Sequence, residues 1–454
     1  MTSPAATGRG AQPRPSLTQA DAVAMIVGIV IGVGIFRAPP IVAGNSSSAG
    51  IFLALWAAGG VISLVGALCY AELGSAYPNA GGEYFFLRRA YGDWLGFLFA
   101  WARMAVIQTG AIALIAFVVG DYATQIFSLG EKSSAIYAAL AVVLITALNI
   151  AGTTQGKWLQ NILAIVLALS ILGVVVAGLS ATPPAAAAAP AVADKAAPLF
   201  SGLALIFILL TYGGWNEAAY LTAEMRDTKR GIVRALIIGI VIITALYMLL
   251  NLAYLNALGL AGMRESKAVA TDLMKATWGG AGALVLGAAV VTAALSTLNA
   301  TVFTGARTNY ALGRDFALFG FLGNWHARSD SPVNALLLQC AIALLLVLLA
   351  SFTPDGFQTM VAYTAPAFWL FFLLTGLSLF VLRRQPPVNA DPFRVPLYPV
   401  TPILFCAMCV YMLYSSFNYA MSLDPGSIGA IVGIAVLCAG IPVMLVARGT
   451  QRQR

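Results

Sequence analysis

Three glycines and two prolines interrupt the first apolar stretch of the chain. Gly28, Gly32 and Gly34 lie within it, and Pro39 and Pro40 follow. A helix through this stretch is expected to break, which frees N–H groups at the start of one half-helix and C=O groups at the end of the other. Free N–H groups at a positive helix end bind a carboxylate, whereas free C=O groups bind an ammonium group. One site with both features suits an α-amino acid.

A second cluster of glycine and polar residues, Thr-Tyr-Gly-Gly-Trp-Asn-Glu, occupies residues 211–217 of a later apolar stretch. The two clusters open the two halves of a five-plus-five arrangement of spans, and paired interruptions of this kind indicate a transporter's binding site. The alternative is that the glycines only allow close helix packing. The pairing and the acidic Glu217 favour a binding site. A dinucleotide-binding fingerprint is excluded, because Arg37 stands where its third glycine would be.

Charged side chains within apolar spans are costly and therefore indicate functional positions. Glu217 ends the second cluster, where it would bind an amine, carry a proton or form an ion pair with Arg103. Arg37 lies outward of the first cluster, where it would form an outer gate with Asp355 or extend its side chain to the membrane surface.

The elements that must position these residues are membrane-spanning helices. Of the 454 residues, 60% are hydrophobic and 9% are charged, whereas a soluble domain has about 25% charged residues. At about 20 apolar residues per span, the sequence predicts an all-α polytopic membrane protein with about twelve transmembrane helices, eleven being the alternative. The predicted spans are Ala20–Ala43, Ile51–Tyr77, Trp94–Gly120, Ala135–Ile150, Trp158–Leu179, Phe200–Glu224, Ile232–Asn256, Trp278–Leu312, Val333–Ala350, Gly356–Leu382, Thr401–Met421 and Ser427–Val446.

Loop charges predict the orientation, because Lys and Arg gather in cytoplasmic loops. Eighteen of the 25 Lys and Arg residues fall in segments that are inside when the N-terminus is inside, and five fall in outer loops. Both termini are therefore predicted to be cytoplasmic, in the inner or plasma membrane of the cell. The predicted units are a disordered tail at 1–19, a first repeat at 20–180, an Ala/Pro-rich outer loop at 181–199, a second repeat at 200–382, a cytoplasmic loop at 383–400, two last spans within 401–446 and a tail at 447–454.

Several other classes of function are disfavoured. The net charge of +8 is spread over many loops, so it reflects topology and predicts no nucleic-acid partner. His326 is the only histidine and no GxSxG motif occurs, so no catalytic residue and no enzyme activity are predicted. The five cysteines all fall in predicted spans, which favours packing over a disulfide framework or a metal site. A channel or a non-transporting receptor is the alternative from another class.

Four motifs in order resemble those of the amino acid–polyamine–organocation (APC) superfamily. The first is Gly-Ile-Val-Ile-Gly-Val-Gly-Ile-Phe at 28–36. The second consists of segments 70–73 and 78–84, the third of segments 212–216 and 224–225, and the fourth of segment 296–307. The third is most similar to the sixth span of L-type amino acid transporters. The resemblance covers spans one to ten. It implies a LeuT-type fold of five-plus-five inverted repeats, followed by two C-terminal helices, that works by alternating access.

The resemblance also implies where the substrate binds. Its carboxylate would meet the amides of Gly32, Val33 and Gly34. Its amine would meet carbonyl groups, and aromatic and amide side chains would shape or gate the pocket. The carbonyls are those of Val30, Leu210, Thr211 and Gly213, and the side chains are those of Tyr212, Trp215 and Asn216.

Two departures from the family pattern bear on coupling and partners. The fifth span has Leu167 where many members place a lysine whose ammonium fills a cation position. The loop at 121–134 lacks the cysteine through which L-type transporters join a glycoprotein, so no disulfide-linked partner is predicted.

A sodium site is also implied by the register of the eighth span. Ser296 and Thr297 align with two hydroxyl ligands of sodium-coupled relatives, and the carbonyls of Gly28, Ile31 and Ala293 would complete a five-oxygen cage. Alternatively, both hydroxyls donate hydrogen bonds to carbonyls of their own helix. Transport would then be coupled to H+, carried by Glu217, instead of to Na+. No other cofactor is predicted.

The sequence therefore predicts a secondary active transporter, or permease, for an amino acid substrate. The L-type likeness favours a neutral side chain. A polyamine or cationic amino acid transporter or antiporter is the alternative, since Glu217 leaves room for a second positive charge.

Overall fold

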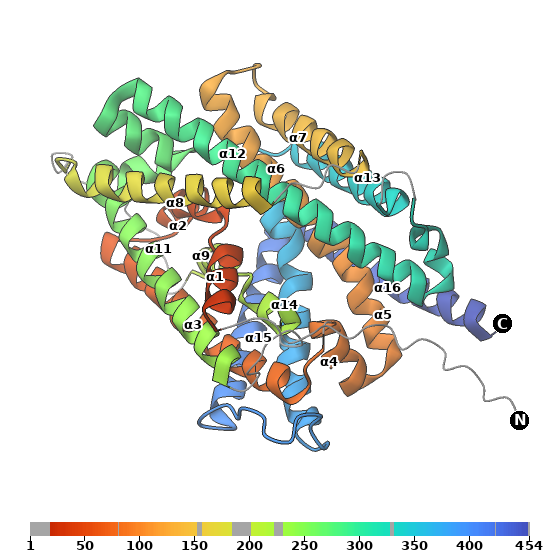
Figure 1. Cartoon of the computed structure of the whole chain (residues 1–454). Coiled ribbons are helices and arrows are strands. Elements are labelled where there is room, and N and C mark those ends of the chain that lie inside the picture. Colours follow the sequence, from red (N-terminus) through yellow and green to blue (C-terminus); the bar gives the residue numbers. More distant parts are fainter. Residues whose placement is uncertain are drawn as a thin grey trace, which may run out of the picture.

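In a computed structural model of the chain, the described residues form a bundle of helices (Figure 1). The structure describes residues 19–79, 81–151, 157–183, 201–221, 230–326, 331–422 and 424–452. The predicted N-terminal tail, apart from its last residue, and most of the predicted outer loop at 181–199 lie outside these ranges.

Within the described ranges, nine helices are long and apolar enough to cross a membrane. Each overlaps one predicted span, so the chain is an integral membrane protein with many apolar helices. They are α3 (Ala49–Ala76), the succession of α5 (Asp93–Ala102), η2 (Arg103–Ile107) and α6 (Gln108–Ile126), α7 (Ser133–Ile150), α11 (Arg230–Glu265), α12 (Val269–Asp315), α13 (Val333–Ala350), α14 (Gly356–Leu382), α15 (Val400–Met421), and η6 (Pro425–Ser427) continuing into α16 (Ile428–Arg452).

The predicted fifth, first and sixth spans are also helical within the described residues. The fifth is α8 (Lys157–Ser180). The first and sixth are each divided where the glycine clusters stand. The first consists of α1 (Gln19–Val30), the turn η1 (Val33–Phe36) and α2 (Ala38–Gly44), and the sixth of α9 (Gly202–Thr211), the turn η3 (Trp215–Glu217) and α10 (Ala218–Leu221).

The predicted end of the seventh span, Asn256, and the predicted start of the eighth, Trp278, lie close to the points where the backbone leaves helical geometry, Gly259 and Gly279. Helix α11 continues to Glu265, and α12 already begins at Val269. Each helix bends at a glycine of positive φ, Gly259 at 67° in α11 and Gly279 at 72° in α12. Glycine adopts this backbone conformation at little cost, so each long helix carries an additional segment at that end. Two short loop helices, α4 (Gly82–Tyr91) and η5 (Ala317–Gly323), were also not predicted.

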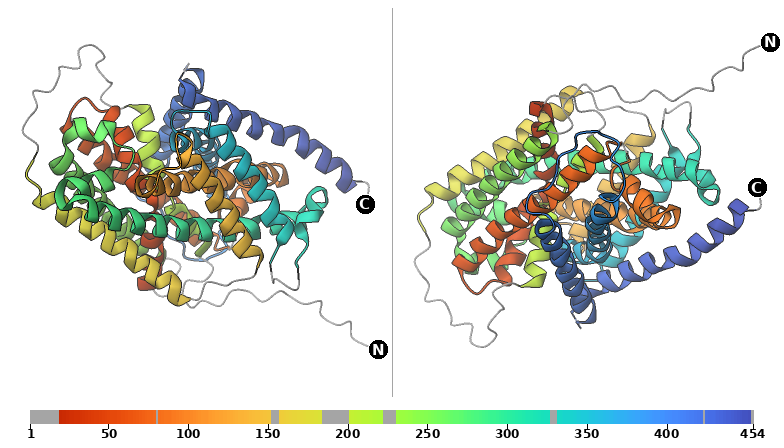
Figure 2. Two further views of the ribbon diagram at one scale, coloured as in Figure 1. Left: turned by 90° about the horizontal axis from the view of Figure 1, so that it is seen from above. Right: turned by 90° about the horizontal axis from the view of Figure 1, so that it is seen from below.

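The interrupted spans lie in the middle of the bundle (Figure 1). Helix α1 packs against α11, and α2 packs against both α9 and α11. Helix α12 crosses the molecule and contacts α6, α7 and α8. The C-terminal part of α16, by contrast, projects away from the other helices (Figure 2). The residues that flank the two breaks, Val30, Val33, Thr211 and Trp215, are buried.

The two halves of the chain repeat one order of elements. An interrupted helix is followed by a long helix, a second long helix, a helix of 18 residues and another long helix. This series is α1 to α8 in the first half and α9 to α14 in the second, with α7 and α13 as the 18-residue members.

Glu72, near the end of α3, anchors the segment that follows α14. Its buried carboxylate accepts hydrogen bonds from Nε and Nη2 of Arg383, both at 2.6 Å, and from the backbone N–H of Val395 at 2.7 Å. Arg394 adds an ion pair at 3.1 Å. A buried carboxylate needs such donors, because an unpaired charge is costly away from water.

Candidate functional site

The first break begins where α1 ends at Val30. The N–H of Gly32 turns back to the carbonyl of Val30 at 2.6 Å, and the backbone of Gly32 is extended, with φ −93° and ψ 176°. A new helical turn then starts at Val33. Because the first amides of a helix have no partner within it, those of Val33 and Gly34 are directed at the break. Of the three amides implied for a carboxylate, that of Gly32 is therefore engaged here.

The second break begins where α9 ends at Thr211. The N–H of Gly213 bonds to the carbonyl of Leu210 at 3.1 Å, and Gly214 has a φ of 106°. This left-handed conformation favours glycine. The chain then turns into η3, where the N–H of Glu217 bonds to the carbonyl of Gly214 at 3.0 Å. The carbonyls at the end of α9 have thus lost the helix that would have bonded them.

The two breaks meet. A Cβ atom added to Gly34 would lie 3.3 Å from Oγ1 of Thr211. The hydroxyl of Tyr247, in α11, lies 2.9 Å from the carbonyl of Val30 and 3.2 Å from that of Thr211. The structure therefore brings both predicted clusters to one place, with the Tyr247 hydroxyl between the two helix ends.

Tyr247 was not predicted as a site residue. Tyrosines in membrane proteins usually mark the interface with water, but Tyr247 lies in the middle of the seventh predicted span and is fully buried. A hydroxyl at that depth needs a hydrogen-bond partner within the protein. The position of Tyr247 in the middle of a predicted span was therefore the sequence feature that could have indicated a buried hydrogen-bonding role.

The two aromatic residues of the second cluster point to different places. The Tyr212 hydroxyl donates to the carbonyl of Trp56 at 3.1 Å, and its ring lies 5.0 Å from that of Tyr247. Trp215 instead packs against Tyr70, with ring centroids 5.1 Å apart, and against an aromatic group on α14 and α15. Tyr212 therefore lines the break, whereas Trp215 is a core residue in this conformation.

Glu217 forms an ion pair with Arg103, at 3.3 Å between Oε1 and Nη2. Arg103 opens the π-helical turn η2, and such turns are frequent at functional sites. Asn216 is buried beside Glu83 of the loop helix α4. Glu83 was not predicted as a site residue, and its Oε1 accepts a hydrogen bond from the Tyr70 hydroxyl at 2.5 Å.

Arg37 joins three helices on the other side of the first break. Its Nε lies 2.8 Å from Oδ2 of Asp121 at the end of the third span, and its Nη2 bonds to Oδ2 of Asp355. The guanidinium also lies over the ring of Phe357, 5.5 Å from its centroid. We call Arg37, Asp121 and Asp355 the Arg37 clasp. Asp121 was missed because it lies one residue beyond the predicted end of the third span.

The residues of the implied sodium site are only partly brought together. The Thr297 hydroxyl donates to the carbonyl of Ala293 at 3.1 Å, in its own helix. Gly28 is exposed, and a Cβ atom added to it would meet nothing within 4 Å. Helix α1, which contains Gly28, packs mainly against α11, whereas the turn η1 contacts α12.

The sequence profile of a family described as amino acid permease matches residues 17–439. The chain belongs to this family. It is therefore an amino acid transporter of the APC type and not an enzyme, as the four sequence motifs indicated.

Curated relatives of this permease match over most of its length. The b(0,+)-type amino acid transporter 1 of Homo sapiens is 31% identical over 403 residues, which are 86% of this chain and 80% of the relative. The human large neutral amino acids transporter small subunit 2 is 29% identical over 451 residues, 96% and 81% of the two chains. The serine/threonine exchanger SteT of Bacillus subtilis is 27% identical over 429 residues, 93% and 94% of the two chains.

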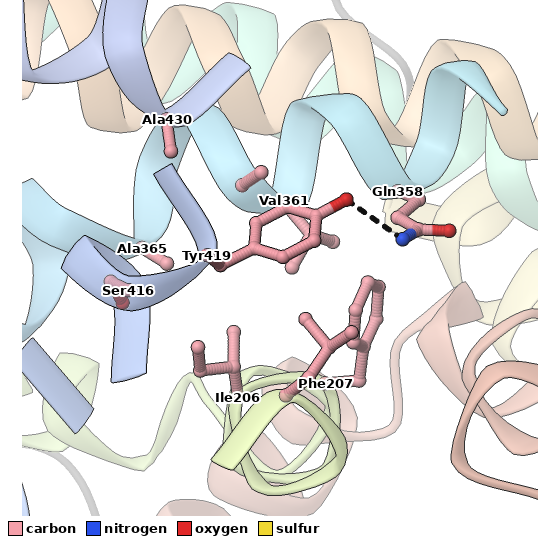
Figure 3. A pocket seen from close by; sticks show the side chains of 10 residues that line it. Ile206, Phe207, Gln358, Val361, Ala365, Ser416, Tyr419 and Ala430 are labelled. Carbon is pink, nitrogen blue, oxygen red and sulfur yellow. Dashed lines mark hydrogen bonds between the residues drawn. The ribbon is translucent and has the colours of Figure 1, made fainter. Parts of the chain in front are cut away.

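A small pocket of the permease lies apart from the breaks. Ile206 and Phe207 of α9 form one wall, and α14, α15 and α16 form the others (Figure 3). Its polar contact is a hydrogen bond of 2.9 Å from Nε2 of Gln358 to the Tyr419 hydroxyl. None of the predicted site residues lines this pocket. It therefore does not form part of the site at the breaks.

Proposed function

We propose that this permease carries a neutral amino acid across the membrane by alternating access. The observation that carries the proposal is that the two breaks meet. Carbonyls at the ends of α1 and α9 and amides at the start of η1 would then face one space. The fold would be LeuT-type, with twelve spans, inverted repeats at 20–180 and 200–382, and two further spans within 401–446. The repeated order of elements in the two halves supports this topology.

In this proposal the substrate replaces contacts that the protein makes with itself. Its carboxylate binds the amides of Val33 and Gly34, where the positive end of η1 favours an anion. Its ammonium binds the carbonyls of Val30 and Thr211, to which the Tyr247 hydroxyl now donates. Tyr212 and the carbonyls of Leu210 and Gly213 complete the wall.

The charges around the breaks favour a neutral side chain. Glu217 is paired with Arg103, and both acids of the Arg37 clasp are paired with Arg37. Glu83, a further described acid beside the second break, is buried and already accepts a hydrogen bond from the Tyr70 hydroxyl. The names of two relatives specify large neutral amino acids and serine/threonine, which supports the same choice for this chain.

The conformation is that of a transporter closed on one side. The Arg37 clasp ties the first span to the third and tenth, and the Tyr122 hydroxyl donates to the carbonyl of Phe36 at 2.8 Å. On the other side of the break, α1 is exposed at Gly28. With both termini cytoplasmic, as the loop charges favour, the closed side is the outer one. We expect no disulfide-linked partner, because the loop at 121–134 has no cysteine.

Reconstituted protein tests this function. We expect saturable and stereoselective uptake of a labelled neutral amino acid, with counterflow against internal substrate. A thermal-shift screen of the twenty amino acids and common polyamines then identifies the ligand, since saturation at 100 times the dissociation constant stabilises the fold by about 2.7 kcal/mol. Stabilisation by putrescine alone would overturn the neutral substrate, and flux without saturation or counterflow would indicate a channel.

A further inference from the structure

Glu83 is a buried acid that the binding of an amino acid does not use. It lies in α4, which is not among the apolar helices that cross the membrane, and it is only 4% exposed. The Tyr70 hydroxyl donates to its Oε1 at 2.5 Å, and the side chain of Asn216 lies within hydrogen-bonding reach. Glu83 therefore connects a loop helix to the second half of the interrupted sixth span.

Two acids share one base at this place. Arg103 pairs with Glu217 at 3.3 Å, while Glu83 is held by neutral donors. When both acids are ionised, the cluster of Glu83, Glu217 and Arg103 carries one excess negative charge. A buried excess charge is costly, and uptake of one proton removes it.

The local environment moves the titration of Glu83 into the physiological range. Burial raises the pKa of Glu83 from 4.5 to about 7, against the opposing effects of the Tyr70 hydroxyl and of Arg103. The nearby charge of Glu217 raises this pKa further, and the Asn216 amide lowers it.

Among the residues that the structure describes, the other charged groups around Glu83 lie at the surface. On the same part of the surface, Arg88 of α4 pairs with Asp93 of α5 at 2.5 Å, and both are exposed. Helix α14 contributes the neutral Thr375 beside Tyr70, and α15 contributes the thiol of Cys409 behind it. Within the described part of the chain, the titration at this place therefore involves Glu83, Glu217 and Arg103.

We propose that Glu83 is a proton-binding site of this permease, where one proton holds α4 against η3 and leaves when the cluster opens to water. The proposal rests on the transport function proposed above. The proton bonds to a carboxylate oxygen of Glu83 and returns to water from the same atom. Glu217, whose side chain is 37% exposed, connects the cluster to water.

The direction of the pH effect follows from the raised pKa. In a state that exposes Glu83 to water, its pKa returns to the ordinary range near 4.5. The proton then stabilises the packed state fully below pH 4.5, progressively less as the pH rises to about 7, and not at all above that. Alternating access that opens this cluster is therefore favoured by raising the pH.

Substitution by glutamine tests the proposal, because an amide imitates the protonated acid. Thermal stability in detergent and amino acid exchange in proteoliposomes are measured from about pH 5 to about pH 8, the window in which a carboxyl group with this raised pKa titrates. We expect Glu83→Gln to match the wild type at low pH, to be more stable than it at high pH, and to exchange at a rate that no longer depends on pH. Asp93→Asn, an exposed acid nearby, should keep the wild-type profile.

Two further variants separate the alternatives. Tyr70→Phe removes the hydroxyl that favours the ionised carboxylate, so the midpoint of the wild-type profile should move to higher pH. A midpoint that stays or falls would contradict the assignment, as would a wild-type profile in Glu83→Gln. Glu217→Gln that alone abolishes the pH dependence would place the proton on Glu217. Amino acid exchange that is intact but indifferent to pH in every variant refutes the proton site and leaves the transport function standing.

Discussion

Gly34 stands where the two interrupted spans touch, and in the proposed site its missing side chain leaves space for the substrate. A Cβ atom there would already lie 3.3 Å from Thr211 Oγ1. We expect Gly34→Ala to weaken uptake and Gly34→Val to abolish it, because the methyl groups fill the space over the amides of Val33 and Gly34. Overpacking of this kind costs about 1–3 kcal/mol, so expression should largely survive.

The matched control is Gly44→Val at the end of α2, where a Cβ atom would meet nothing within 4 Å. Its uptake should resemble that of the wild type. Near-normal affinity in Gly34→Val would mean that the carboxylate binds elsewhere.

Tyr247 contributes a single hydroxyl to the same place. Tyr247→Phe removes the donor to the carbonyls of Val30 and Thr211 and leaves the ring. We expect the apparent affinity for substrate to rise by about tenfold, or about 1.4 kcal/mol, because the ammonium group no longer displaces a hydrogen bond that the empty site makes. Tyr212→Phe is the control, since it removes a buried hydroxyl that bonds to Trp56 instead. Equal losses in both variants would mean that Tyr247 only stabilises the fold.

At the scale of elements, the Arg37 clasp holds the first, third and tenth spans together. Asp121→Asn removes one of the two carboxylate charges that pair with Arg37. It should weaken the closed side, which we propose is the outer one, by about 1–3 kcal/mol, as for hydrogen bonds to charged groups. We expect a cysteine placed at the buried position of Phe357 to react faster with an impermeant thiol reagent added outside. Asp424→Asn, which removes an acid that caps η6, should leave that rate unchanged. A slower reaction in Asp121→Asn would show that the clasp does not close this side.

The sequence predicted the interruptions correctly because glycine and polar residues in a lipid-embedded helix have few explanations. It did not predict what faces them. Tyr247 and Asp121 reach the site from helices that are distant in sequence, and their contacts follow from tertiary packing. The additional helical segments after Gly259 and before Gly279 were not predicted, since each lies beyond a residue at which the backbone leaves helical geometry.

Glu83 shows the same limit for a loop. The segment around Glu83 resembles a family motif. Only the fold, however, buries this acid and brings it from α4 to Asn216 of η3. The chemistry of such a position depends on neighbours that no local pattern specifies.

At the scale of the whole molecule, we propose that the position of α1 decides whether the implied sodium site can form. In this conformation α1 packs on α11, and the Thr297 hydroxyl bonds within its own helix. We therefore expect uptake into proteoliposomes to change less than about twofold, or about 0.4 kcal/mol, when choline replaces sodium at fixed pH and zero potential. Ser296→Ala and Thr297→Ala should then also be close to wild type. Sodium-driven uptake that both variants lose would show that the cage of Gly28, Ile31, Ala293, Ser296 and Thr297 forms when α1 moves to α12.

The contact between Tyr247 and the two helix ends has a consequence for what the transporter accepts. A phenol offers one hydrogen, yet two carbonyl oxygens lie within 2.9 and 3.2 Å of it. The empty site therefore holds fewer hydrogens than its oxygens can use, and a primary ammonium group supplies three. An α-hydroxy acid supplies one and leaves the shortage in place, so alanine should bind more tightly than lactate by about 1–3 kcal/mol. The deficit itself would thus distinguish amino acids from their hydroxy analogues, whatever side chain they carry.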